Sequence, residues 1–236
     1  MIKKIAKKIV RSVAKIRFIE RIIFYIIKSK NAVVVYYNDP IRARTMHIIK
    51  KIRSETEMLM HDNEAYQVYM LAEKTAKIKG DIAEVGVYTG GSAKLICEAK
   101  EDRALHLFDT FNGLPSLSKN DNQKQFYAGQ FSASLDSVKN YLKGYKKVYF
   151  YKGIFPNTAK PIKNKKFSFV HLDVDIYKST LDCLKFFYPR MRKGGIIISH
   201  DYINAPGVKK AIDEFFEDKP EPIIEICQQA MIVKIR

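Results

Sequence analysis

The chain has 236 residues, 47% of them hydrophobic and 28% charged, a composition that excludes intrinsically disordered and fibrous proteins. Residues 1–30 hold ten basic residues and one acid, so they carry +9 of the net charge of +17 and leave +8 for the other 206 residues. This ordinary balance over most of the chain disfavours nucleic acid as a partner. Three separated cysteines without a CxxC pair exclude a zinc ribbon and a thioredoxin-like site, and indicate reduced thiols in a cytoplasmic protein.

Residues 1–30 predict a basic amphipathic helical arm. Apolar residues recur at three- or four-residue steps from Ile2 to Ile26, which places them on one helical face, opposite the lysines and arginines. We favour binding to an anionic membrane surface, where each basic residue contributes on the order of 1 kcal/mol. Packing on this domain or on a partner subunit is the main alternative, and RNA is disfavoured. Neither a bilayer-spanning segment nor a secretory signal is found, so we expect a cytoplasmic protein, peripheral on the inner face of the membrane.

Two regions follow the arm. Residues 31–79 predict a helical region that ends at Gly80, and residues 80–236 predict one α/β domain. In that domain, short β-branched runs alternate with helical patterns, which indicates a parallel sheet with helices on both faces. The expected strands are 81–88, 103–109, 148–152, 167–173 and 195–199, and the expected helices are 92–100, 135–142, 180–188 and 208–216.

The end of the chain has a different pattern. The apolar runs 222–227 and 230–235 are separated only by Gln228 and Gln229, and no helix lies between them. They predict a hairpin, so the last strand must run antiparallel to its neighbour. Seven strands with a terminal antiparallel hairpin are typical of the Rossmann-like sheet of class I S-adenosylmethionine methyltransferases.

A glycine-rich turn follows the first expected strand. Ligands of an open parallel sheet bind beyond the carboxyl ends of its strands, and glycines let the backbone approach a ligand closely. The spacing after Gly86 is GxxxGG and not the dinucleotide fingerprint GxGxxG, so a nucleotide without a pyrophosphate fits better. Asp109 ends the second strand, where an acid commonly holds ribose hydroxyls.

Acidic residues also end the fourth and fifth expected strands. Asp173 and Asp175 follow the fourth strand, and His200 and Asp201 follow the fifth. Because neighbouring strands lie roughly 5 Å apart, we expect these side chains to share one cleft. Carboxylates so close together need a cation or a shared proton. Aspartate is also a frequent turn residue, but two such strand ends side by side favour a functional site.

Residues 80–216 resemble the macrocin O-methyltransferase family, which methylates sugars of macrolides. The arm before residue 31 is not part of the resemblance. The matching segments are GDIAEVGVYTGGS (80–92), LFDTFNGLP (107–115), ASLDSVKNY (133–141), KGIFPNT (152–158), HLDVDIYKSTLDCLKFFYP (171–189), GGIIISHDY (194–202) and PGVKKAIDEF (206–215).

The resemblance implies S-adenosyl-L-methionine as cofactor and assigns residues to it. The methionine side is implied to be lined by Glu84, Gly86, Val87 and Tyr88, and Gly90 of the same turn is also assigned to the cofactor site. The adenosine is implied to be held by Asp109, Thr110 and Phe111, with Ser134, Gly153 and Ile154 around the adenine. The family also holds a magnesium ion through an Asp of the fourth strand and an Asp-Asp pair of the fifth; here Asp173 and Asp201 match, and His200 replaces the first Asp of the pair.

His200 leaves three alternatives open. The site holds magnesium through Asp173, Asp201 and water, or it holds a softer ion such as manganese through His200. In the third alternative there is no metal, and His200 or Asp173 is the general base. We favour a divalent metal, with magnesium ahead of manganese or another ion, with Asp173, His200 and Asp201 as its ligands and Asp173 and His200 as the catalytic residues.

The predicted function is S-adenosylmethionine-dependent O-methylation of a sugar hydroxyl of a glycan or glycosylated metabolite. Residues 31–79 and the loop 115–132 are expected to recognise the acceptor, the loop acting as a lid. The alternatives are a membrane-associated, non-catalytic scaffold with the methyltransferase fold, and a methyltransferase acting on RNA or a small phenol. The acceptor, the methylated position and the oligomeric state, a homo-oligomer included, are left open by the sequence.

Overall fold

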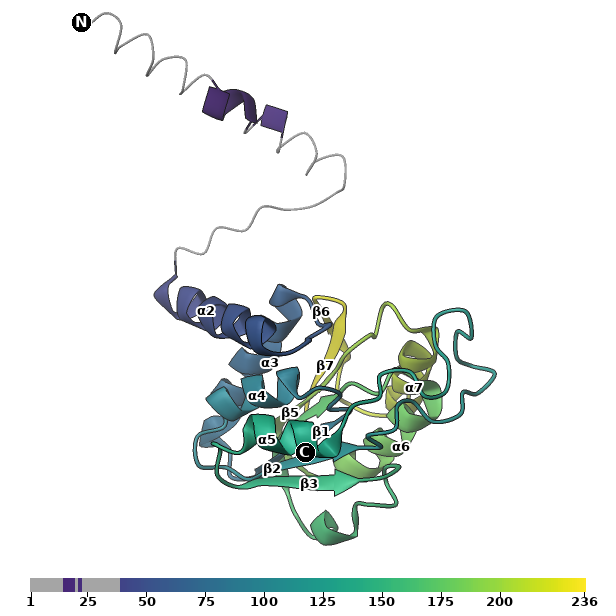
Figure 1. Cartoon of the computed structure of the whole chain (residues 1–236). Helices are drawn as coiled ribbons and strands as arrows, with labels where there is room; N and C mark the ends of the chain where they lie inside the picture. The colour runs from purple at the N-terminus through teal and green to yellow at the C-terminus, as the bar shows by residue number, and fades with distance from the viewer. Residues whose placement is uncertain (1–14, 20, 23–38) are drawn as a thin grey trace, which may run out of the picture. The chain divides into compact units, whose positions relative to one another are not determined.

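The structure is a computed structural model that describes residues 15–19, 21–22 and 39–236 (Figure 1). The chain divides into two compact units, Met1–Ala43 and Arg44–Arg236. In the first unit, residues 15–19 and 21–22 are helical; the rest of the predicted arm and the start of the 31–79 region lie outside the described residues. Within the described residues, no helix combines the length and the apolar character that crossing a membrane requires.

A seven-stranded sheet forms the centre of the second unit. The five parallel strands are β1 (Asp81–Val85), β2 (Leu105–Asp109), β3 (Val148–Lys152), β4 (Phe167–Leu172) and β5 (Met191–Ser199). β6 (Ile224–Ile226) and β7 (Gln229–Val233) form the antiparallel hairpin, and β7 also pairs antiparallel with β5. The spatial order is β3-β2-β1-β4-β5-β7-β6. β2 and β3 are added on one side of β1 and β4 and β5 on the other, so the order of strands in the sheet reverses between β1 and β4. The predicted fold is confirmed.

Helices cover both faces of this sheet (Figure 1). One face packs against α2 (Pro40–Glu55), α3 (Asp62–Lys74), α4 (Gly91–Ala99) and α5 (Leu135–Leu142). The other face packs against α6 (Tyr177–Phe187) and α7 (Pro206–Phe216). Because successive strand residues point to opposite faces, Ile82 enters the first core and Ala83 the second. Two buried faces explain why the strands read as nearly continuous apolar runs.

The helical region before the sheet is interrupted between Glu55 and Asp62. Arg53 holds the intervening segment: its guanidinium donates to the backbone oxygens of Met58, at 2.6 Å, and Met60, and pairs with Asp62 at 2.9 Å. The segment 56–61 is thereby presented to the carboxyl ends of the strands. Residues 44–79 belong to the same compact unit as the sheet.

Of the seven strands only β3 has the predicted bounds, and the ends of β1 and β5 differ for reasons that the backbone shows. β1 ends at Val85 and not at Tyr88, because the backbone turns at Gly86 with φ +86° and at Tyr88 with φ +49°. β5 begins at Met191, before the predicted start at Gly195. In both cases the apolar run in the sequence does not mark where the ladder of strand hydrogen bonds begins or ends.

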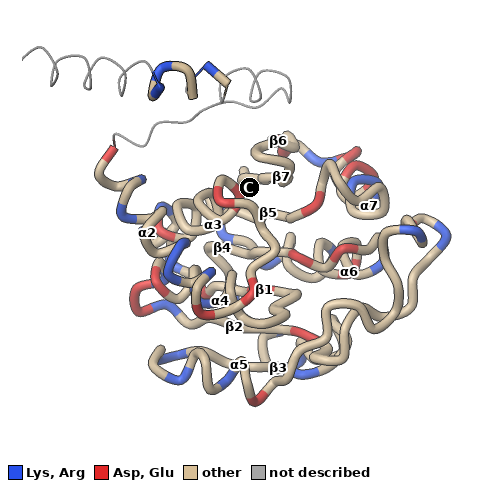
Figure 2. Tube along the Cα trace, turned by 45° about the horizontal axis from the view of Figure 1, so that its top comes forward, with Lys and Arg blue, Asp and Glu red and all other residues tan. Residues whose placement is uncertain are grey.

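Basic and acidic residues are interspersed along residues 39–236, and neither sign dominates one long stretch of the tube (Figure 2). Several are paired with one another, for example Lys94 with Glu55 at 2.5 Å. This distribution agrees with the ordinary charge balance that the sequence shows beyond residue 30.

Candidate active site

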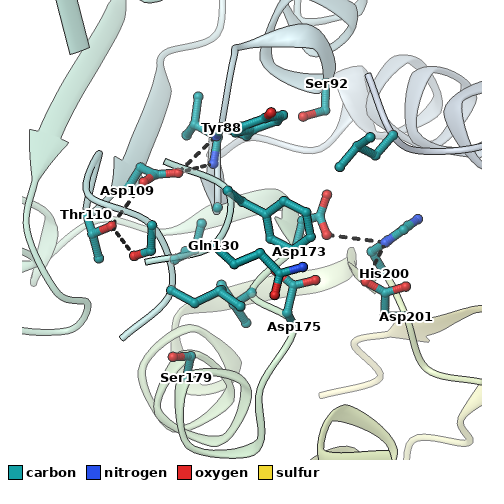
Figure 3. A pocket seen from close by; sticks show the side chains of 18 of the residues that line it. Tyr88, Ser92, Asp109, Thr110, Gln130, Asp173, Asp175, Ser179, His200 and Asp201 are labelled. Atoms are coloured by element: carbon teal, nitrogen blue, oxygen red, sulfur yellow. Dashed lines mark hydrogen bonds and ion pairs between the residues drawn. The ribbon is translucent and has the colours of Figure 1, made fainter. Parts of the chain in front are cut away.

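A cavity of about 300 Å³ lies at the carboxyl ends of the parallel strands. Its lining includes the turn after β1, the ends of β2, β4 and β5, the segment 57–61 and the loop 113–131. Asp109 lies at one side of the close view, and His200 and Asp201 lie at the other (Figure 3). The two groups of residues that the sequence singled out therefore share one cavity.

Seven of the residues expected around the cofactor line this cavity: Gly86, Val87, Tyr88, Asp109, Thr110, Gly153 and Ile154. The other four do not line it. Glu84 is fully buried, with Oε1 at 2.9 Å from Nδ1 of His171, and Phe111 belongs to the first core. Gly90 and Ser134 are the N-cap residues of α4 and α5.

The Asp109 carboxylate joins the two loops that follow β1 and β2. Its Oδ2 accepts hydrogen bonds from the backbone N–H groups of Val87, at 2.6 Å, and Tyr88, at 2.9 Å (Figure 3). Its Oδ1 accepts one from the N–H of Phe111 at 2.6 Å. The carboxylate thus fixes the shape of the glycine turn. A carboxylate has acceptor capacity beyond three hydrogen bonds, so the contact with ribose hydroxyls stays a prediction.

Three carboxylates surround His200 at the other end of the cavity. Its Nδ1 lies 2.9 Å from Oδ2 of Asp201 and 3.3 Å from Oδ1 of Asp173, and its Nε2 lies 3.3 Å from Oε2 of Glu64. The Glu64 side chain is 4% exposed and the His200 side chain 12%. α3, which carries Glu64, therefore closes this end of the site.

The charges of this cluster perturb one another. Burial disfavours the charged imidazole, but Asp173, Asp201 and Glu64 raise the pKa of His200 well above its usual value. Burial alone would raise the pKa of Asp173, and the neighbouring His200 lowers it below the usual range. Burial and the carboxylates of Asp173 and Asp201 raise the pKa of Asp175 well above its usual value.

Backbone strain gathers at the same cavity. Tyr88, Asp175 and Asp201 adopt left-handed conformations, with φ of +49°, +60° and +57°. Such conformations cost a non-glycine residue of order 1 kcal/mol or more and are common at functional sites.

Asp173, His200 and Asp201 fit a divalent ion. One ligand atom from each lies within 4.8 Å of the other two. Among the described residues, neither ring nitrogen of His200 has a hydrogen-bond partner of good alignment, although carboxylate oxygens approach both nitrogens closely. Ligands at about 2.1 Å from one octahedral ion lie about 3 Å apart, so separations of 2.9 and 3.3 Å from Nδ1 suit ligand atoms of one ion as well as a direct ion pair.

The sequence interpretation missed two residues that lie here. Glu64 and His61 come from the helical region, which has no motif that indicates a site. Asp175 was expected in the cleft and lines the cavity, but the sequence assigned it no role. A further wall of the cavity is aromatic: the rings of Tyr88 and Phe131 meet edge to face at 5.9 Å, and the Tyr88 hydroxyl donates to Glu57 at 2.7 Å. The two segments expected to recognise the acceptor, residues 31–79 and the loop 115–132, both contribute residues to the lining of the cavity.

The fold and its ligand-binding edge are those of a class I methyltransferase. The family model described as macrocin-O-methyltransferase (TylF) matches residues 61–234, and the chain belongs to this family, as the sequence resemblance predicted. Demethyldecarbamoylnovobiocin O-methyltransferase of Streptomyces niveus is 29% identical over 58% of this chain, and mycinamicin III 3''-O-methyltransferase of Micromonospora griseorubida is 29% identical over 65%. The chain spans 58% of the length of the first and 68% of the second.

Solved structures show the same fold. The O-methyltransferase NovP superposes with a TM-score of 0.67 at 23% identity, over 81% of this chain and 88% of that chain. The calicheamicin methyltransferase CalS11 gives 0.64 at 17% identity, over 84% and 94%. An O-methyltransferase from Bacillus cereus in complex with SAH gives 0.56 at 12% identity, over 85% and 94%. At these identities the likeness concerns the fold alone.

Proposed function

We propose that this chain is an S-adenosylmethionine-dependent O-methyltransferase that acts on a sugar hydroxyl of a glycosylated metabolite or glycan. One observation carries the proposal: a single cavity joins the glycine turn at Gly86 to the cluster of Asp173, His200 and Asp201. The family membership supports the reaction class. The relatives are named as O-methyltransferases of demethyldecarbamoylnovobiocin and, at a 3'' position, of mycinamicin III, which supports a glycosylated metabolite as the acceptor.

S-adenosylmethionine would lie against Gly86, Val87, Asp109, Thr110 and Gly153. The residues fit it: the turn at Gly86 has no Cβ, and Asp109 holds the turn in place from the end of β2. When bound, this cofactor supplies a methyl group on a positively charged sulfur. The chain's own task is then to position the acceptor oxygen and to remove its proton.

We assign Asp173, His200 and Asp201 as the ligands of a divalent ion, which when bound lowers the pKa of a hydroxyl coordinated to it. As a ligand, His200 has no free lone pair for the acceptor proton, and Asp173 keeps only the lone pairs of its second carboxylate oxygen. Asp175 lines the same cavity beside them. A cation held by the ligands would offset the two carboxylates that raise the pKa of Asp175 and would leave it able to act as the general base. The aromatic wall of Tyr88 and Phe131 excludes water from the reacting groups.

Calorimetry with S-adenosylhomocysteine tests the proposal. An enzyme of this class binds it with 1:1 stoichiometry, whereas a non-catalytic scaffold need not bind it. Mass spectrometry of glycans and glycosylated metabolites from cells that lack the gene identifies the acceptor by a lost increment of 14 mass units, that of the CH₂ group added. Salt-sensitive RNA binding without any lost glycan methylation would favour an RNA methyltransferase.

We further propose that the arm, residues 1–30, binds the inner face of the cytoplasmic membrane. In its described part, Ile16, Phe18, Ile19 and Ile22 expose apolar side chains next to Lys15, Arg17 and Arg21. A location at an anionic surface would bring the enzyme to lipid-linked or surface glycans. Flotation with anionic vesicles should recover the full chain and not a chain that begins at Asn31; equal recovery refutes the anchor.

A further inference from the structure

We propose that His200 and Glu64 make this site selective for a first-row transition ion, such as manganese, over magnesium. His200 supplies an imidazole ligand through Nδ1, and Glu64 orients the ring through Nε2. The inference rests on the proposed function, because it concerns the ion of the same site. It goes beyond the proposed function by naming the class of ion and a positioning residue, Glu64, that acts through His200.

The two nitrogens of the His200 ring face different partners. Nδ1 faces the two strand-end carboxylates, at 2.9 Å from Asp201 and 3.3 Å from Asp173. Nε2 faces Glu64 alone, at 3.3 Å. In a neutral imidazole one nitrogen carries the proton and the other offers a lone pair. Glu64 selects the tautomer in which Nε2 carries the proton and the lone pair of Nδ1 joins the two carboxylates.

A histidine that binds a metal commonly donates its other N–H to a carboxylate, which fixes the ring and raises its basicity. Glu64 has the properties of such a partner. It is buried, and its Oε2 also accepts the backbone N–H of His61 at 2.6 Å, which holds the carboxylate in place at the start of α3.

The donor set decides the class of ion. Magnesium binds oxygen ligands almost exclusively, whereas imidazole suits iron, zinc and related ions, and manganese accepts both carboxylate and imidazole. A site of two carboxylates and one imidazole nitrogen therefore loses affinity for magnesium relative to a site of three carboxylates. Asp173 and Asp201 are shared with the family pattern, so His200 is the residue that carries the difference.

The test uses the full chain, freed of metal by chelation and titrated with MnCl₂ and MgCl₂ by calorimetry. We expect 1:1 binding of manganese, and a ratio of manganese to magnesium affinity that falls at least tenfold in His200→Asp. His47→Asp, the same substitution at an exposed position of α2, should leave the ratio unchanged. A ratio that is equal in His200→Asp and the unmodified chain overturns the inference.

A spectroscopic readout decides the matter even where His200→Asp does not fold. Electron spin echo measurements on manganese bound to the unmodified chain should show coupling to a ¹⁴N nucleus, which only a nitrogen ligand produces. Manganese bound without this coupling, or no manganese binding at millimolar concentration, overturns the inference. The latter is the result expected if a protonated His200 takes the place of an ion.

Glu64→Gln tests the positioning role. It should lower the manganese affinity about tenfold, and Glu64→Asp should restore part of it, because a carboxylate again faces Nε2. Glu73→Gln, on the same helix, is the matched control. Unchanged affinity in Glu64→Gln refutes the role of Glu64.

S-adenosylhomocysteine binding, measured in the same samples, separates the two proposals. If it binds 1:1 while the nitrogen coupling is absent, the ion selectivity is refuted and the methyltransferase proposal stands. If it does not bind, the proposed function itself fails.

Discussion

A Cβ atom at Gly86 would lie 1.7 Å from the backbone oxygen of Asp173. The turn after β1 and the end of β4 are therefore in direct backbone contact, and the contact joins the cofactor side of the cavity to the acidic cluster. Asp173 N–H also donates to the oxygen of Val85 at 2.9 Å, which ties the same two strand ends together. The glycine turn and the acidic cluster are thus held at a fixed distance from each other.

Gly86→Ala should destabilise the fold by about 3 kcal/mol or more, because the added methyl group meets backbone that cannot rotate away. Gly129→Ala is a matched control: Gly129 has nearly the same φ, +87°, but no atom lies within 4 Å of its added Cβ. Its cost should be about 1–2 kcal/mol, from the left-handed conformation alone. Urea unfolding measures both variants, and equal losses would contradict the contact argument.

Asp109→Asn should weaken S-adenosylhomocysteine binding at least tenfold. The amide places an NH₂ group where the carboxylate accepts N–H groups of Val87, Tyr88 or Phe111, so the glycine turn loses part of its support. Calorimetry measures the affinity. Asp102→Asn, at an exposed position, is the control, and an affinity within twofold of the unmodified chain would remove Asp109 from the binding site.

Asp175→Asn should lower kcat by about 10²-fold or more, the usual contribution of a general base, while S-adenosylhomocysteine affinity changes less than threefold. Asp173→Ala should abolish turnover and also the binding of manganese, with cofactor affinity mostly retained. Single-turnover methyl transfer to the identified acceptor measures the rates, with Asp218→Asn as control. Full turnover in Asp175→Asn would show that the proton goes elsewhere.

Glu221 should make the free energy of unfolding fall more steeply as the pH is lowered. Burial opposes its charge, but the Tyr188 hydroxyl, Lys234 and the Ile235 N–H lower its pKa from 4.5 to about 2. A lowered folded-state pKa contributes stability that is complete above the unfolded-state pKa and is lost as the pH falls from about 5 to about 2. The shift corresponds to roughly 3 kcal/mol.

Urea unfolding of Glu221→Gln and the unmodified chain at pH 7, 5, 4 and 3 tests this. The difference in the free energy of unfolding should be largest at pH 7 and shrink below pH 5. Glu225→Gln, on β6 and exposed, should follow the unmodified chain at every pH. A difference that does not depend on pH would mean that packing, and not charge, gives Glu221 its effect.

The sequence by itself determined the sheet and its polarity. Alternating apolar runs and helical patterns require a parallel sheet with two covered faces, and the two-residue gap at Gln228 requires a hairpin. From that topology it follows that Asp109, Asp173, Asp175 and His200 lie at one edge, since parallel strands end on the same side. These inferences depend only on periodicity and on short connections, which are local properties of the chain.

Only the tertiary structure decided what these residues touch. It turned the Asp109 carboxylate toward the backbone of the loops that follow β1 and β2. It also brought Glu64 to His200 from a region that the sequence marks only as helical. It also made glycine necessary at position 86, because the backbone of Asp173 occupies the space of a side chain. Such contacts join segments far apart in the chain, and their energies depend on the packing of whole elements, so no local pattern of residue types encodes them.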